Sequence, residues 1–183
     1  MTDTNYFLDI DVPGGVQVSV NGSNIIVKGK NGELSRNIAN PRFEFFVENN
    51  KVLIRLREGI KFSARDKMLM NTNMAHLKNM LRGVQEKYTA RLKICSGHFP
   101  MQVIVQDNAL QIKNFLGEKV PRRASLMSHV KVTVQGDIIL VEGIDKEKVG
   151  QTAATIEQST RITNRDRRIF QDGLYIISKP GEE

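Results

Sequence analysis

The chain has 183 residues, with 27 lysines and arginines against 20 aspartates and glutamates, which gives a net charge of +7 and an isoelectric point near 9.6. A basic balance of this kind favours an anionic partner such as nucleic acid. The single cysteine, Cys95, excludes an intramolecular disulfide framework and a thiolate zinc cage, and it predicts a reducing, cytoplasmic compartment.

The N-terminus and the apolar runs predict a soluble protein without a targeting segment. Met1–Asp11 carries three aspartates and has neither the basic segment nor the apolar segment of a secretory leader. Every apolar run is far shorter than the ~20 residues that span a bilayer. We therefore expect no membrane partner.

An apolar pattern near the N-terminus recurs 114 positions later in the chain. The repeated residues are Val16, Val18, Val20, Gly22 and Gly29, which recur as Val130, Val132, Val134, Gly136 and Gly143. Repetition of this kind indicates that one supersecondary unit is used twice. We therefore predict an N-terminal module, residues 1–87, and a C-terminal module, residues 88–183, both of ordinary domain size.

The first half of the N-terminal module is predicted to form two β-hairpins. Val16–Val20 and Ile25–Val27 flank Asn21-Gly22, a dipeptide that favours a tight turn. Phe43–Val47 and Val52–Leu56 alternate apolar and polar residues on either side of an Asn-Asn pair. The alternation predicts that each hairpin buries one face.

From Ser63 onward the apolar period changes from that of a strand to that of a helix. Ser63 or a neighbour can cap this helix, and Gly83 is expected near its end, where glycine is common as a left-handed residue. The apolar stripe consists of Met70, Met74, Leu77, Leu81 and Val84.

The C-terminal module reuses these parts in another order. Strands are predicted around Tyr88–Cys95, Met101–Val105 and Leu110–Ile112, before the repeated hairpin Val130–Val141. A helix follows, with Asp145 as the expected N-cap. Its apolar face comprises Val149, Ala153, Ile156 and Thr160. Both modules therefore predict an α+β fold in which a mostly antiparallel sheet is packed on one side by a helix.

Two basic segments belong to the C-terminal module. Arg161–Arg168 holds four arginines directly after the second helix, and the aromatic residues Phe170 and Tyr175 follow it. Lys113–Arg123 lies between predicted strands. An arginine can donate two hydrogen bonds to one phosphate, and an aromatic ring can stack on a splayed base. A solvated charged surface is the alternative interpretation of both segments.

The remaining reactive residues do not predict an enzyme. His76, His98 and His129 are scattered over different elements without a metal-ligating pattern. Cys95 and His98 could supply half of a zinc site or a nucleophile and base, but without a second half a buried structural cysteine is favoured. Gly14-Gly15 lacks the spacing of a phosphate-binding loop. We therefore predict no catalytic residue, no metal site and no cofactor.

Several motifs resemble those of one known family. Val12–Val16, Val27–Gly29 and Gly32–Arg36 resemble the opening of the universal ribosomal protein L6 family of the large subunit. Asn114–Lys119 and Asn164–Tyr175 resemble its archaeal and eukaryotic branch. The short chain without long extensions favours an archaeal origin. The resemblance covers essentially the whole chain, including its length and its duplicated architecture.

This resemblance implies a structural constituent of the large ribosomal subunit, not an enzyme. It implies binding to large-subunit (23S) rRNA, chiefly through the C-terminal module, near the sarcin-ricin loop and the stalk base where translational GTPases dock. The implied partners are this rRNA, neighbouring large-subunit ribosomal proteins including those of the stalk base, and nearby GTPases. Carried over by position, the rRNA-binding candidates are Lys113, Asn114, Lys119, Arg122, Arg123, Arg161, Asn164, Arg165, Arg167, Arg168, Tyr175 and Lys179.

Two expectations concern the basic C-terminal tail. Bacterial relatives carry a Tyr, Asn-Pro and Lys-Gly-rich motif where this chain has Arg165–Arg168 and Asp172-Gly173, so bacterial contact details do not transfer to this chain. Crowded charges repel one another, and we therefore expect the tail to gain order when RNA binds.

A protein-binding adaptor is the alternative function. It would use exposed strand edges or the helix that carries Met68, Met70, Met74 and Met80, with the positive charge serving only solubility.

Overall fold

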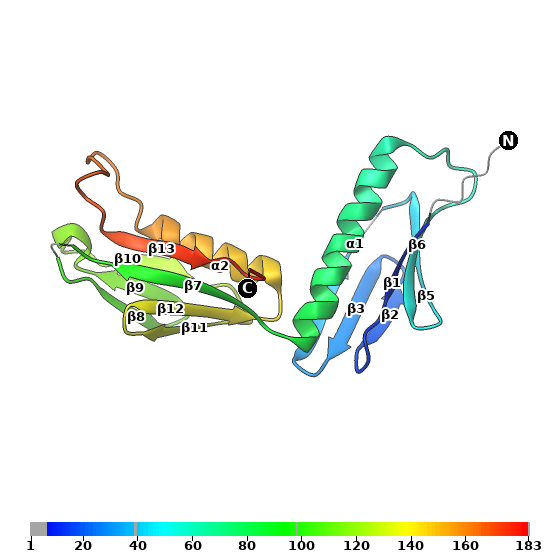
Figure 1. Ribbon diagram of the computed structural model, residues 1–183, viewed down its shortest axis with the longest axis horizontal. Helices are drawn as coiled ribbons and strands as arrows, with labels where there is room; N and C mark the ends of the chain where they lie inside the picture. Colours follow the sequence, from blue (N-terminus) through cyan, green and yellow to red (C-terminus); the bar gives the residue numbers. More distant parts are fainter. Residues whose placement is uncertain (1–6, 39, 98, 183) are drawn as a thin grey trace. The chain divides into compact units, whose positions relative to one another are not determined.

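The structure, a computed structural model, describes residues 7–38, 40–97 and 99–182. The chain divides into two compact units, Met1–Lys87 and Tyr88–Glu183, each with one long helix and antiparallel strands (Figure 1). His98, a candidate partner of Cys95, lies outside the described residues. Residues 1–6, part of the segment compared with a secretory leader, also lie outside them. Neither long helix in the described ranges combines the length and apolarity needed to cross a bilayer.

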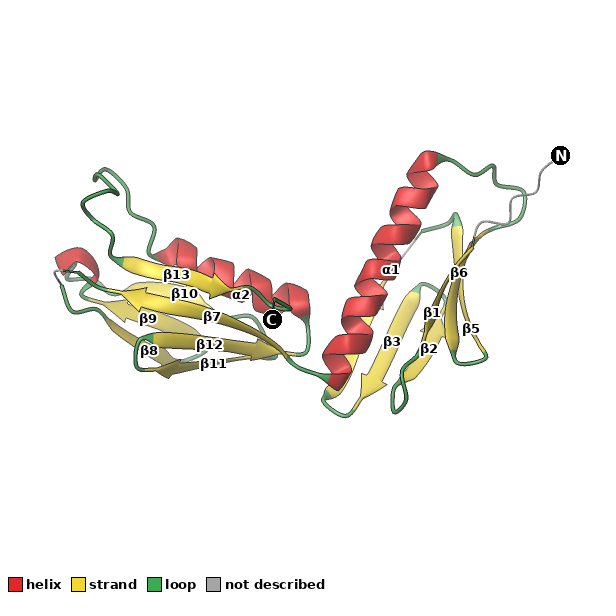
Figure 2. Cartoon of the chain, viewed as in Figure 1, coloured by secondary structure: helices red, strands yellow, loops and turns green. Residues whose placement is uncertain are grey.

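The N-terminal module packs one helix against two three-stranded antiparallel sheets, β1-β6-β5 and β2-β3-β4 (Figure 2). The apolar stripe of α1 is buried against both sheets together with Met80, as the spacing predicts. The elements are β1 (Phe7–Asp11), β2 (Gln17–Asn21), β3 (Asn24–Gly29), β4 (Gly32–Asn37), β5 (Phe43–Glu48), β6 (Lys51–Leu56) and α1 (Ala64–Gln85).

The C-terminal module has a four-stranded sheet, β11-β12-β7-β13, and a three-stranded sheet, β10-β9-β8, and both are antiparallel. Helix α2 packs on this assembly through Val149, Ala153 and Ile156. The elements are β7 (Tyr88–Cys95), β8 (Gln102–Gln106), β9 (Ala109–Lys113), the short 3-10 helix η1 (Phe115–Gly117), β10 (Arg122–Ser125), β11 (Val130–Gln135), β12 (Ile138–Gly143), α2 (Lys146–Ser159) and β13 (Gly173–Ser178).

The structure confirms the α+β class and the antiparallel hairpins, and it differs in detail. Each module has two sheets and not one, and β1, β4, β10 and β13 are strands that were not predicted from the sequence. Gly83 is buried inside α1 and does not cap it. The helix continues to Gln85, and its C-cap is Glu86, an extended residue whose N–H donates to the Arg82 carbonyl at 2.8 Å.

An acidic residue links the start of α1 to the strand region before it. Ser63 caps the helix in a capping box with Asp66, whose side chain is only 3% exposed. Arg42 Nε and Nη2 donate hydrogen bonds to the two oxygens of the Asp66 carboxylate, each at 2.8 Å. The hydrogen bonds from Arg42, and then those from Ser63, lower the pKa of Asp66 to about 2 from an ordinary 3.8.

We expect Asp66→Asn to remove a pH-dependent part of the stability. A carboxyl whose folded pKa lies below its unfolded pKa stabilises the fold fully above about pH 5, and this contribution is lost as the pH falls towards 2. The melting temperature of Asp66→Asn should therefore lie below that of wild type at pH 7, and this difference should become smaller as the pH falls from about 5 towards 2. Asp107→Asn, in an exposed hairpin turn, is the control and should follow the wild-type profile. If the melting temperatures of Asp66→Asn and wild type changed in parallel with pH, the Asp66 carboxylate would not be the source of this stability.

Candidate nucleic-acid interface

Three loops meet at one end of the C-terminal module. The Gly97 N–H donates to the carboxylate of Asp172, which joins the loop after β7 to the loop after α2. Asn114 Nδ2 donates to the Pro100 carbonyl at 3.1 Å, which joins the loop after β9 to the loop after β7. Figure 2 shows η1 and the α2–β13 loop at this same end. The two basic segments, distant in sequence, are therefore brought together.

The net positive charge of the C-terminal module comes from this end. We define the basic end as residues 113–123 and 161–172, which hold eight lysines and arginines and three acidic residues. The rest of the module, residues 88–112, 124–160 and 173–183, holds six basic and eight acidic residues. The module's charge excess therefore comes wholly from the basic end, which creates a local positive potential that attracts polyanions.

The backbone of the basic end turns sharply at residues that tolerate left-handed conformations. Asn114 leaves β9 with φ 59°, and Gly117 closes η1 with φ 79°. Asn164 has φ 58° in the loop after α2. Asparagine and glycine adopt such φ values at low cost, so the Asn114 and Asn164 of the family motifs have a clear backbone role. Leu116, with φ 48°, is the one bulky residue of η1 in this conformation.

Arg122 is held by contacts within the protein. Its Nε and Nη2 donate to the two carboxylate oxygens of Glu118 at 2.8 and 2.6 Å. Nη1 donates to the carbonyls of Ser159 at 3.0 Å and Arg161 at 3.2 Å, and the guanidinium lies 4.2 Å from the centroid of the Phe115 ring. Arg122 is among the rRNA contacts that the family resemblance implies, whereas all three of its guanidinium nitrogens are already engaged in the structure.

The arginines after α2 have exposed guanidinium groups. Arg165 lies 4.9 Å from the centroid of the Phe170 ring, and Arg168 pairs with Asp166 at 2.7 Å while its side chain stays 90% exposed. The Arg168 hydrogen bonds lower the pKa of Asp166, and Asp166 raises the pKa of Arg168. An exposed pair of this kind contributes little to stability, so Arg168 can exchange Asp166 for a phosphate at low cost.

The segment called the tail is a loop closed by a strand. β13 pairs with β7 along the edge of the sheet and includes Tyr175, whose hydroxyl donates to the Gln171 carbonyl at 3.2 Å. Lys179 follows the far end of β13, so it lies away from the other candidates. The exposed cations that the structure brings together are Lys113, Lys119, Arg123, Arg161, Arg165, Arg167 and Arg168.

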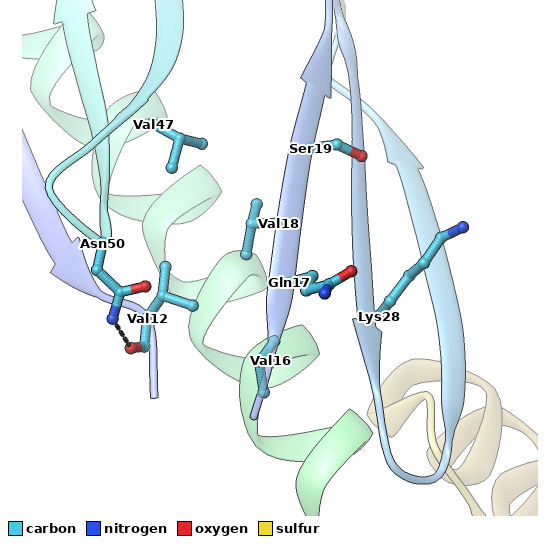
Figure 3. Close-up of a pocket in the computed structure, with 8 residues that line it drawn as sticks. All are labelled: Val12, Val16, Gln17, Val18, Ser19, Lys28, Val47 and Asn50. Carbon is cyan, nitrogen blue, oxygen red and sulfur yellow. Dashed lines mark hydrogen bonds between the residues drawn. The ribbon is translucent and has the colours of Figure 1, made fainter. Parts of the chain in front are cut away.

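Outside the basic end, the described residues include two surface pockets, both in the N-terminal module. Within those residues, no group of three or more His, Cys, Asp or Glu side chains could hold a metal ion. A pocket of about 500 Å³ lies in the N-terminal module, where Asn50 donates to the Val12 carbonyl at 2.8 Å (Figure 3). Lys28 is the one ionisable side chain in its lining, and it pairs with Glu33 at 3.1 Å.

A duplicated α+β chain whose C-terminal module gathers its net positive charge on the loops of one end has the organisation of a structural binding protein. A family model described as Ribosomal protein L6 matches residues 12–87 and 99–173, one segment in each module. This chain therefore belongs to the ribosomal protein L6 family. Its members are structural proteins without enzymatic activity, which confirms the resemblance seen in the motifs and the non-enzymatic prediction.

Curated relatives agree over nearly the full length. The large ribosomal subunit protein uL6 of Methanococcus vannielii is 44% identical over 174 residues, covering 95% of this chain and 94% of the relative. The uL6 proteins of Methanothrix thermoacetophila and Methanobrevibacter smithii are each 45% identical, over 170 and 172 residues; both alignments cover 93% of this chain and respectively 95% and 94% of the relative. All three are archaeal, as the branch-specific motifs predict.

Proposed function

We propose that this protein is a structural constituent of the large ribosomal subunit in the cytoplasm and that it binds large-subunit rRNA mainly through the basic end. The concentration of positive charge at that end is the observation that carries the proposal. Folded RNA presents phosphates and 2′-hydroxyls in a fixed geometry, and a rigid basic surface recognises that geometry with little reading of base identity. The two sheets and α2 supply this rigidity.

Individual side chains have different roles in this proposal. The seven exposed cations of the basic end neutralise phosphates, and Phe170 and Tyr175 offer rings near them for stacking. Asn114 and Asn164 set the course of the loops. In this proposal Arg122 does not contact phosphate directly, because its guanidinium nitrogens are engaged within the protein. Lys179 does not contact phosphate at the basic end either, because it follows the far end of β13. We further propose that binding adds order to residues 165–175, of which residues 173–175 already pair with β7 in the free protein.

We place the binding site near the sarcin-ricin loop and the stalk base, where the protein would support the docking of translational GTPases beside neighbouring ribosomal proteins. Family membership is the support for this location. Hydroxyl-radical footprinting of large-subunit rRNA with and without the protein tests it. Protection of the sarcin-ricin loop and of the rRNA at the stalk base is the expected result, and protection confined to other regions would contradict it.

The structure weakens one of the two supports for the adaptor function, the methionine-bearing helix. Met70, Met74 and Met80 are buried in the core of the N-terminal module, and only Met68 of that group is exposed, at 57%. These methionines therefore pack against the sheets of their own module and do not form an accessible docking groove.

We expect RNA binding to depend steeply on salt. Each neutralised phosphate adds ~0.7 to ~0.9 to the slope of log K against log salt, so seven contacts predict a slope between about −5 and −6. Fluorescence anisotropy with a labelled large-subunit rRNA fragment, titrated at several salt concentrations, measures this slope. An unrelated folded RNA of equal length is the control and should bind more weakly. Equal affinity for the two RNAs would contradict a specific rRNA site.

A further inference from the structure

We propose that Arg122 is a positioning residue: together with Glu118 it holds the two segments of the basic end in the single arrangement that fits rRNA. This inference rests on the proposed function, because it explains how the cations of that function are kept in place. Arg122 itself would not contact phosphate.

The contacts of Arg122 join elements that are far apart in the sequence. The Glu118 carboxylate belongs to the loop between η1 and β10, whereas the Ser159 and Arg161 carbonyls belong to the end of α2 and the loop after it. Carbonyls at the end of a helix lack partners within the helix, and the helix dipole favours a cation there. One guanidinium therefore satisfies these carbonyls and ties the loops together.

The partial burial of Arg122 supports this assignment. Its side chain is 27% exposed, with the guanidinium against the Phe115 ring, and Phe115 is itself buried in the core of the module. A lysine could not reproduce the arrangement, because it lacks the planar fork that donates to both oxygens of a carboxylate while also reaching two carbonyls. The geometry is thus specific to arginine.

The presence of Glu118 would otherwise be unfavourable for RNA binding. It is an acidic residue in the middle of a basic surface, where its charge repels phosphates. The hydrogen bonds from Arg122, followed by the charges of Arg122 and Arg165, lower the pKa of Glu118, so its carboxylate remains ionised. A carboxylate at this position favours RNA binding overall if the benefit of orienting Arg122 exceeds the repulsion between Glu118 and phosphate.

Glu118→Gln therefore separates positioning from simple electrostatics. The substitution makes the basic end more positive by one charge, so a surface that bound RNA by charge alone would bind more tightly. Because the Arg122 anchor is weakened and loop order must then be gained during binding, we expect about three- to tenfold weaker binding to the large-subunit rRNA fragment. Tighter binding or unchanged affinity would overturn the proposal.

Arg122→Lys and Arg123→Gln form a matched pair. Arg122→Lys keeps the charge but loses the fork, so hydrogen exchange in the free protein should speed up at the amides of Glu118 and Phe170, which are hydrogen bonded in these loops. Arg123→Gln loses one exposed charge and should reduce the salt slope by ~0.7 to ~0.9 without altering exchange. Unchanged exchange in Arg122→Lys would overturn the proposal.

These experiments distinguish the two proposals. If wild-type protein failed to bind rRNA, the proposed function would fail, and hydrogen exchange on the free protein would still decide whether Arg122 orders the loops. Circular dichroism and the melting temperature show whether each variant is folded. Glu118 is partly exposed, so its amide variant should keep the native fold.

Discussion

Replacing Arg165, Arg167 and Arg168 together with glutamate should weaken binding to the large-subunit rRNA fragment by at least about 100-fold. Each lost charge-assisted hydrogen bond to phosphate contributes about 1.5 kcal/mol or more, and each new carboxylate adds repulsion. The slope of log K against log salt should also become shallower by about 2 to 3. Anisotropy titrations at several salt concentrations measure both quantities.

A matched variant in the N-terminal module controls for net charge. Arg65, Lys67 and Lys78 are exposed on α1, so replacing all three with glutamate changes the total charge by the same amount. If the basic end binds the RNA, this control should keep an affinity within a few-fold of wild type. Comparable losses in the two triple variants would show that total charge, not the basic end, determines binding.

Local signals in the sequence were sufficient for the hairpins and the helix starts. The Asn49-Asn50 pair adopts φ values of 48° and 61°, which are those of the tight turn that joins two antiparallel strands. Ser63 and Asp145 cap α1 and α2 as predicted, because a side-chain oxygen at that position satisfies a free backbone N–H. Each of these signals acts over a few residues, so it can be recognised without knowledge of the tertiary fold.

Features set by long-range packing could not be predicted in the same way. β4 alternates weakly in hydrophobicity, and its assignment depends on pairing with β3. β13 lies after a basic loop, and only its pairing with β7 makes it a strand and not a tail. Gly83 resembles a helix end in the sequence, but burial of Val84 against the sheets extends the helix past it.

In the candidate site, too, some features follow from local sequence and others only from long-range packing. The composition of the two basic segments identified them as the most cationic parts of the C-terminal module. Their convergence depends on contacts between loops, such as that of Asn114 with Pro100, which no local pattern encodes. The spacing of Glu118 and Arg122 is a signal that could have indicated an ion pair, since the two residues lie four positions apart. The carbonyls of Ser159 and Arg161, which complete the role of Arg122, could not have been found from the sequence.

The last glycine of the internal repeat, Gly29 in one module and Gly143 in the other, lies close to a packed helix. Gly29 ends β3, where an added Cβ would lie 2.8 Å from Cγ2 and 2.9 Å from the carbonyl oxygen of Val84. Gly143 ends β12, where an added Cβ would lie 2.8 Å from Cγ2 of Val149 and 3.3 Å from the carbonyl oxygen of His129. In both modules the glycine lets the helix approach the second strand of the repeated hairpin.

We expect Gly29→Ala to lower the free energy of unfolding by about 1 to 3 kcal/mol, the usual cost of overpacking a core. Val84 is fully buried and its backbone is fixed in α1, so neither atom can retreat easily. Gly143→Ala should cost less, because the methyl contact is equally close at the two glycines but the nearest backbone oxygen is farther away at Gly143, 3.3 Å against 2.9 Å. Gly14→Ala is the control: an added Cβ there meets open space, and the change should stay within about 0.5 kcal/mol. Urea unfolding followed by circular dichroism gives the three values, and a Gly29→Ala variant as stable as Gly14→Ala would show that close helix approach is not why the repeat keeps this glycine.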